Sequence, residues 1–191
     1  MSHGGYTTAE LYAITYGVRD ITKSLENKLT CGTATRLRRF VDAVLEYTGA
    51  EEIDIIAHSM GVTYARIIIQ GNMWILHRFG FWAGPSCPGY TDVKQCSSDD
   101  LFPCSDNYGD ILEKLNDSND DAKYIASFWS TNDTIIGPSN RAYGWRTSIV
   151  LGTKKEMKYD GLTHYTLKTD TVSDQLKILQ LELEFCVKSK D

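Results

Sequence analysis

The stretch Ile53–Gly61 reads IDIIAHSMG, and it indicates the fold class more clearly than any other part of the chain. Ile53–Ala57 is an apolar run too short for a helix, so we expect a buried β-strand there. Ser59 follows on a sharp turn, with the small residues Ala57 and Gly61 two positions to either side. A serine on a tight turn between a strand and a helix is typical of a nucleophile elbow, where larger flanking residues would collide with neighbouring backbone.

The turn at Ser59 supports two interpretations. In the first, the hydroxyl stands at the carboxyl edge of a sheet, where the Met60 N–H at the start of the next helix can stabilise an oxyanion. That helix is expected to run to about Gln70. The commoner elbow begins with glycine, whereas this one begins with Ala57. In the second interpretation, Ser59 merely caps the helix that runs from Gly61 onward.

A serine hydroxyl needs a base to remove its proton, and His164 is the best candidate for that base. In folds with such a nucleophile elbow, the catalytic residues follow the chain order serine, acid, histidine. The chain has four histidines, and His3 and His58 precede the serine. His77 follows it too closely to leave room for a strand that carries the acid. We therefore expect His164, in the loop after the last strand, to be the base.

Asp133 is the expected acid, because it follows the predicted strand Tyr124–Trp129 at its carboxyl end. The alternative is an aspartate that only stabilises the turn around it. Asp160 is the second choice, although it lies only four residues before His164. Two further acids, Asp106 and Asp110, are less well placed.

Helices and strands are expected to alternate along the chain. The other predicted strands are Leu11–Tyr16, Phe79–Ala83 and Met157–Tyr159. One predicted helix starts with Thr33 as its N-cap and ends at Gly49, and the C-terminal helix starts with Thr171 as its N-cap and carries an apolar face from Val172 to Val187. This alternation predicts an α/β fold with a mostly parallel sheet and helices on both faces. We expect one domain spanning residues 1–191, with an irregular, cysteine-containing insertion at residues 85–121.

Composition narrows the classes of function. The 191 residues carry a formal net charge of −5 with no basic stripe, which argues against binding to nucleic acid. No apolar run reaches the roughly 18 residues that a membrane span needs. The expected chemistry requires no metal and no organic cofactor.

The five cysteines favour an oxidising compartment. Three of them fall between residues 87 and 104, in a segment rich in Pro, Gly, Ser and Asp. Clustered cysteines in such a segment suggest disulfides in a secreted protein, although residues 1–6 show no signal-peptide pattern. The alternative is free or buried thiols. The segment Pro85–Asp121 either covers an acyl pocket or is a stapled surface loop.

Several stretches together resemble the class 2 triacylglycerol lipases, particularly the secreted nematode members. They are YAITYG, LRRFVDAVLEYTGAEEIDIIAHSMGVTYARIIIQG, WAGP, WSTNDTIIG and GLTHYTLKTDTVSDQ. The AHSMG stretch also resembles the elbow of small bacterial lipases. The resemblance implies an α/β-hydrolase fold, carboxylic ester hydrolysis, secretion, transient contact with lipid surfaces, and a triad of Ser59, Asp133 and His164.

The chain departs from that family at its N-terminal side. Family members carry an earlier strand ending in His-Gly, whose loop supplies a second oxyanion donor, and we expect this chain to lack it as an N-terminally truncated form. Loss of one such donor typically costs about 10²–10³ in rate. The sheet must then pair its strands differently or leave backbone groups unpaired. One alternative is therefore an impaired or non-catalytic binding protein, and another is a thioesterase or amidase that uses the same triad.

Overall fold

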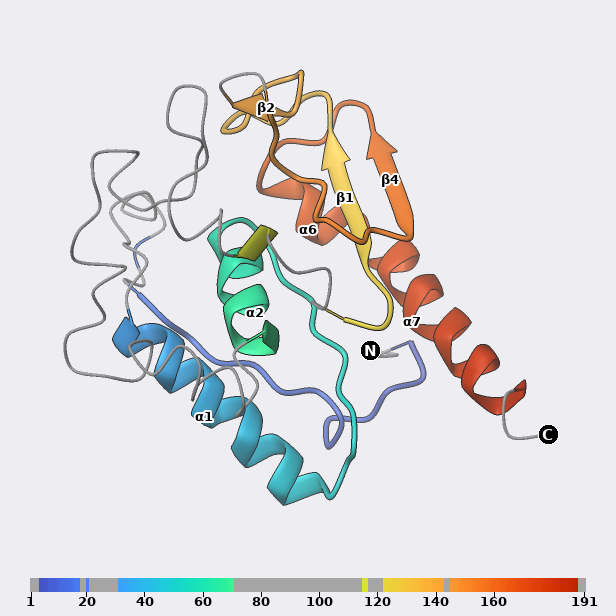
Figure 1. The fold of residues 1–191 in the computed structure, drawn as a ribbon. Helices are drawn as coiled ribbons and strands as arrows, with labels where there is room; N and C mark the ends of the chain where they lie inside the picture. The colour runs from blue at the N-terminus through green and yellow to red at the C-terminus, as the bar shows by residue number, and fades with distance from the viewer. Residues whose placement is uncertain are drawn as a thin grey trace. The chain divides into compact units, whose positions relative to one another are not determined.

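The computed structural model describes residues 4–17, 20, 31–70, 115–116, 122–142 and 145–188. The chain divides into two compact units, residues 3–122 and residues 123–191. The elements are α1 (Cys31–Thr48), α2 (Met60–Gln70), β1 (Ala126–Ser130), β2 (Arg141–Ala142), β3 (Trp145–Arg146), β4 (Lys155–Tyr159), α6 (Thr166–Asp170) and α7 (Val172–Lys188) (Figure 1).

Several predictions fall outside the described residues. They are the strand Phe79–Ala83, nearly all of the insertion at residues 85–121, the side chains His3, His77, Asp106 and Asp110, and the cysteines Cys87, Cys96 and Cys104. Only the backbone is described for Cys31, in α1, and Cys186, in α7. The expected disulfides therefore stay a prediction.

In the first unit, α1 packs against α2 (Figure 1). The buried core consists of Ala34, Leu37, Tyr64, Ile67, Ile68 and Leu115. Tyr64 is only 1% exposed, and its ring meets that of Tyr16 edge-on at 5.2 Å between centroids. This apolar contact fixes the helix that begins directly after Ser59.

The far end of α2 is fastened by polar groups that are buried and hydrogen-bonded. Arg66 donates from Nη2 to the Leu115 carbonyl at 2.9 Å and from Nη1 to Asn116 Oδ1 at 2.9 Å. Gln70 donates to the same Leu115 carbonyl at 2.8 Å. Arg66 and Gln70 are 7% and 8% exposed. Because a buried polar group is costly unless it is bonded, these contacts tie residues 115–116 to α2.

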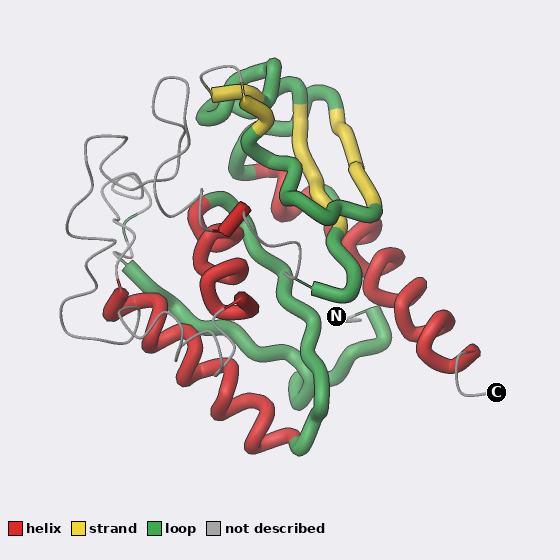
Figure 2. Tube along the Cα trace, viewed as in Figure 1, coloured by secondary structure: helices red, strands yellow, loops and turns green. Residues whose placement is uncertain are grey.

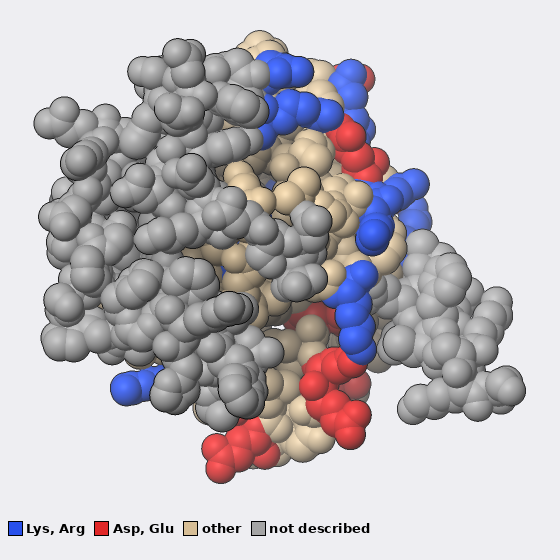
Figure 3. Space-filling model, in the orientation of Figure 1, with Lys and Arg blue, Asp and Glu red and all other residues tan. Residues whose placement is uncertain are grey.

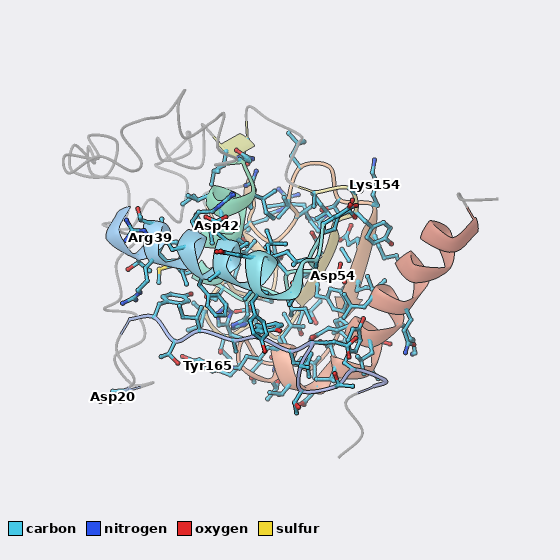
Figure 4. The ribbon with its side chains drawn as sticks, turned by 90° about the horizontal axis from the view of Figure 1, so that it is seen from below. Asp20, Arg39, Asp42, Asp54, Lys154 and Tyr165 are labelled. Carbon is cyan, nitrogen blue, oxygen red and sulfur yellow. The ribbon has the colours of Figure 1, made fainter. Side chains whose placement is uncertain are left out.

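The boundaries of α1 confirm one prediction and correct another. The helix ends before Gly49, whose φ of +67° and N–H bond to the Leu45 carbonyl make a left-handed end. It begins at or before Cys31, so Thr33 lies inside the helix and the prediction that it is the N-cap was wrong. An N-cap needs a non-helical backbone, which a residue within the hydrogen-bonded turns does not have. Arg39 and Asp42 project from this helix (Figure 4).

Two predicted strands are not strands in the structure. Leu11–Tyr16 and Ile53–Ala57 are both loop, and among the described residues neither pairs with a neighbour (Figure 2). Ile53, Ile55 and Ile56 are 37%, 37% and 64% exposed, so the run is not buried either. A strand needs a partner for its N–H and C=O groups, and apolar sequence alone does not supply one.

The second unit contains a parallel pair of strands. β1 pairs with β4 in the register Ala126↔Lys155 to Ser130↔Tyr159, and their arrows point the same way in Figure 1. The rings of Phe128 and Tyr159 stack across the pair at 5.9 Å. Both strands were predicted. Compared with the prediction, β1 begins two residues later and ends one residue later, and β4 begins two residues earlier. A short antiparallel hairpin, β2 with β3, lies in the connection between them.

Charged side chains surround a tryptophan on one face of this unit. Arg146 and Lys158 lie 5.2 and 5.6 Å from the centre of the Trp129 ring. The Trp129 indole N–H donates to Glu156 at 2.7 Å, and Glu156 also pairs with Arg146. Figure 3 shows lysine and arginine side chains gathered over β1, β2 and β4. This network holds the β2–β3 connection against the strand pair.

The C-terminal helices follow β4. α6 contacts β1 and α7, and Thr171 lies between the two helices. Thr171 was predicted to cap α7, but its hydroxyl donates back to the Leu167 carbonyl at 2.6 Å. Its backbone carbonyl instead accepts the N–H groups of Asp174 and Gln175. Of the predicted apolar face, Val172 is 48% exposed, and the side chains beyond residue 180 lie outside the described part of the chain.

The described part of the fold is therefore α/β, with one parallel strand pair and flanking helices. The predicted larger sheet, with Leu11–Tyr16 and Ile53–Ala57 as members, is not present among the described residues. None of the helices described is long and apolar enough to cross a membrane.

Candidate active site

Ser59 sits on a strained turn. Its φ is +56°, a left-handed conformation that costs a non-glycine residue about 1–2 kcal/mol. The turn is closed by two backbone hydrogen bonds, from Gly61 N to the His58 carbonyl at 3.0 Å and from Val62 N to the Ser59 carbonyl at 2.9 Å. The first helical residue is Met60. Strain of this kind persists where surrounding structure holds a functional group in place.

The small residue after the turn is needed for close packing. A side-chain carbon added at Gly61 would lie 3.3 Å from the Tyr16 hydroxyl oxygen, which is tighter than an ordinary contact. A larger residue at position 61 would therefore press against Tyr16, in agreement with the expectation that only a small residue suits this position. Ser59 itself is exposed, and the N-terminus of α2 directly follows it. The partial positive charge of that helix end favours an anion beside the serine.

Asp133 and His164 form a hydrogen-bonded pair in the second unit. Asp133 Oδ2 lies 2.8 Å from His164 Nδ1, and the two residues are 9% and 7% exposed. The other carboxylate oxygen accepts two backbone N–H groups, from Ile135 and Ile136, each at 2.8 Å. The carboxylate is thereby fixed on both oxygens, and it orients the imidazole ring.

The hydrogen bonds keep Asp133 ionised. Burial by itself raises the pKa of Asp133, but the bonds from the Ile136 N–H, His164 and the Ile135 N–H outweigh it, so the pKa lies below its usual 3.8. A carboxylate held on Nδ1 places the ring proton there, and Nε2 is then the nitrogen that accepts a proton from a hydroxyl.

The loop that carries His164 is fixed by a reciprocal pair of threonines. Thr163 N–H donates to Thr166 Oγ1 at 2.9 Å, and Thr166 N–H donates to Thr163 Oγ1 at 3.1 Å. Leu167 N–H then donates to the Thr163 carbonyl at 3.0 Å. His164 therefore lies in a closed turn directly before α6, and its ring is bonded to the Asp133 carboxylate.

Asp160, the alternative acid, makes a different contact. Its Oδ1 accepts the Thr131 hydroxyl at 2.7 Å, and its side chain is 81% exposed. His164 Nδ1 is bonded to Asp133 and not to Asp160. Thr131 could not be singled out from the sequence, because a hydroxyl in a polar turn is common and its partner lies 29 residues away.

Ser59 and Met60 belong to the first unit, whereas Asp133 and His164 belong to the second. The structure brings the acid and the histidine together and places the serine on its own strained turn. Among the described residues, no group of three His, Cys, Asp or Glu side chains is arranged as a metal site would need.

A serine before a helix N-terminus and an imidazole held by a buried carboxylate are the parts with which hydrolases activate a hydroxyl nucleophile. The family model of the class 2 lipases matches residues 1–75 and 80–177. The chain belongs to the class 2 lipase family, a family of enzymes that hydrolyse ester bonds. No curated protein and no solved structure matches the chain.

Proposed function

We propose that the protein is a carboxylic ester hydrolase, of triacylglycerol lipase or esterase type, that acts through Ser59, Asp133 and His164. The observation that carries the proposal is the 2.8 Å bond between Asp133 and His164. Asp133 was predicted from its place after a strand and His164 from chain order and elimination, and these two residues, 31 positions apart, form a buried acid–imidazole pair. Membership of the class 2 lipase family supports the ester substrate.

The reaction proceeds in two acyl-transfer steps. His164 Nε2 takes the proton of Ser59 as the hydroxyl oxygen attacks the ester carbonyl, and the Met60 N–H helps hold the tetrahedral oxyanion. His164 then protonates the departing alcohol, leaving an acyl group on Ser59. Water attacks this acyl-enzyme with His164 again as base, and the acid is released. Asp133 stays ionised throughout and stabilises the imidazolium that forms in each step.

The geometry of Ser59 supports its role as nucleophile. Its left-handed φ and exposed position are those of a residue held up from a turn, and a helix that merely needs a cap does not require either. Secretion and disulfide bonds belong to the same proposal. They rest on the family resemblance and on the clustering of cysteines between residues 87 and 104.

Turnover of p-nitrophenyl esters tests this function. Ser59→Ala is expected to reduce hydrolysis to the uncatalysed level, whereas Ser173→Ala, which alters an exposed serine on α7, should leave it unchanged. Equal activity of the Ser59→Ala variant and the unaltered chain would contradict the proposal.

One observation favours the second candidate, a non-catalytic binding protein. The segment before Ser59 is an exposed loop with no ladder partner among the described residues, so the serine turn lacks the rigid strand support expected of an elbow. Ester turnover above the Ser59→Ala background excludes this candidate. Absence of turnover in the unaltered chain, with binding of a lipid ester retained, would favour it.

A further inference from the structure

Hydrogen bonds join the loop after β1, which carries Asp133, to the loop after β4, which carries His164. Beyond the last paired residues of β1 and β4, Thr131 N–H donates to the Tyr159 carbonyl at 3.0 Å. The Thr131 hydroxyl donates to Asp160 Oδ1 at 2.7 Å, and Asn132 Nδ2 approaches the Gly161 carbonyl at 3.4 Å. We call these three contacts the loop bridge. The next contact in the series is that of Asp133 with His164.

The contacts advance in the same direction along both loops, and the last step, from Asn132 to Asp133, spans three residues from Gly161 to His164 on the other loop. The backbone bond from Thr131 extends the parallel pair by one position, and the side-chain contacts carry the connection past the point where backbone pairing stops. Gly161, with φ of +85°, turns the second loop there. The Thr131–Asp160 bond is the shortest contact between the two loops before the acid–imidazole pair.

We propose that Thr131 and Asp160 are positioning residues that set the orientation of His164 through the loop bridge. The proposal rests on the function proposed above, since it assigns these residues to the same site. The role assigned to Asp160 is to accept the Thr131 hydroxyl, which requires an oxygen acceptor but not a negative charge. The role assigned to Thr131 requires its hydroxyl group but not its methyl group.

Because the Thr131–Asp160 contact is exposed, an effect on catalysis can be distinguished from an effect on stability. Asp160 is 81% exposed, so water competes for its carboxylate and the bond adds little to the free energy of unfolding. A small displacement of a catalytic group, by contrast, lowers turnover by up to about 100-fold. Loss of the bond should therefore appear in kcat and not in the urea midpoint or in KM.

The test uses two pairs of variants and a control. Thr131→Val and Asp160→Ala remove the bond, whereas Thr131→Ser and Asp160→Asn retain a hydroxyl and an acceptor oxygen. Thr134→Val makes the same chemical change as Thr131→Val at an exposed threonine of the same turn. We expect kcat for ester hydrolysis to fall about 10- to 100-fold in the first pair, with KM unchanged, and to fall less than about threefold in the second pair and the control.

A spectroscopic readout does not depend on turnover. The proton on His164 Nδ1, assigned by its loss in His164→Ala, should give a low-field ¹H resonance because of its bond to Asp133. It should broaden or shift in Thr131→Val and Asp160→Ala but not in Thr131→Ser or Asp160→Asn. If the unaltered chain hydrolyses no ester, the proposed function fails, and this resonance alone decides the positioning role.

Three results would overturn the positioning role. The first is full kcat in Thr131→Val, and the second is equal loss in Asp160→Asn and Asp160→Ala, which would assign the effect to charge. The third is a His164 resonance that is the same in Thr131→Val and Thr131→Ser. The first two would leave the ester hydrolase function intact.

Discussion

His164 Nδ1 lies 2.8 Å from Asp133 Oδ2, although 31 residues separate them in the chain. The strand pair explains this meeting. β1 and β4 are parallel and end together at Ser130↔Tyr159, so the loops that follow them start at the same edge. Asp133 comes three residues after one strand end and His164 five residues after the other. The parallel topology thus places Asp133 and His164 side by side.

Replacing Asp133 by asparagine should nearly abolish activity without disturbing the loop. The new amide oxygen can still accept the N–H groups of Ile135 and Ile136, while its NH₂ group faces His164 Nδ1. The ring proton is then forced onto Nε2, which can no longer act as a base. We expect kcat to fall by about 10⁴-fold, measured with a p-nitrophenyl ester.

Asp160→Asn is the matched control for that change. It makes the same substitution at the alternative acid, whose contact is with Thr131. Activity close to that of the unaltered chain is expected. A loss in Asp160→Asn as large as that in Asp133→Asn would mean that the wrong acid has been assigned.

Stability at low pH should depend on Asp133. Its pKa is lower in the folded protein than the 3.8 of a free side chain, so the unfolded chain binds more protons in the window between these two values. The stabilisation is complete above pH 3.8 and is lost as the pH falls through the folded pKa. Urea midpoints measured from pH 5 to pH 2 should therefore fall more steeply for the unaltered chain than for Asp133→Asn. Parallel curves would show that Asp133 does not titrate as its hydrogen bonds require.

The backbone strain at Ser59 should affect the free energy of unfolding of variants at this position. Glycine adopts a φ of +56° without steric cost, whereas alanine retains the strain. Ser59→Gly should thus be more stable than Ser59→Ala by about 1 kcal/mol, and both should be inactive. Urea denaturation measures the difference. A glycine variant less stable than the alanine variant would argue against a left-handed Ser59.

The buried guanidinium of Arg66 should be irreplaceable by lysine. Arg66 donates to the Leu115 carbonyl and to Asn116 from two nitrogens, and a single ammonium cannot reproduce that fork. We expect Arg66→Lys to lower the free energy of unfolding by about 1–3 kcal/mol. Arg39→Lys, on the exposed side of α1, should change it by less than about 0.5 kcal/mol (Figure 4). Similar losses in both variants would refute the importance of the buried contacts.

The pairing of Asp133 with His164 agrees with the sequence analysis, in which the end of a predicted strand and chain order restrict the choice of residues. With four histidines, only His164 leaves room for an acid-bearing strand between it and Ser59. The helix after Ser59 was likewise predictable, since its apolar spacing is local information and α2 ends at Gln70 as expected. Its start at Met60 leaves Ser59 on the turn.

Features that depend on distant partners could not be predicted in this way. Ile53–Ala57 has the composition of a buried strand, but pairing depends on a neighbour that its own sequence does not specify. Thr171 differs for a local reason: its sequence resembles that of an N-cap, but its hydroxyl donates to the Leu167 carbonyl, four residues earlier in α6. The Thr131–Asp160 bond crosses 29 residues, and only the register of β1 with β4 brings the two together.

In the proposed function, Ser59 is a nucleophile that His164 activates. The rate of covalent labelling by a fluorophosphonate, with the adduct located by peptide mass spectrometry, measures this directly. We expect one adduct per chain, on Ser59, formed at least about 10³-fold more slowly in His164→Ala. An adduct on another residue, or labelling of Ser59 at an unchanged rate without the imidazole, would contradict it.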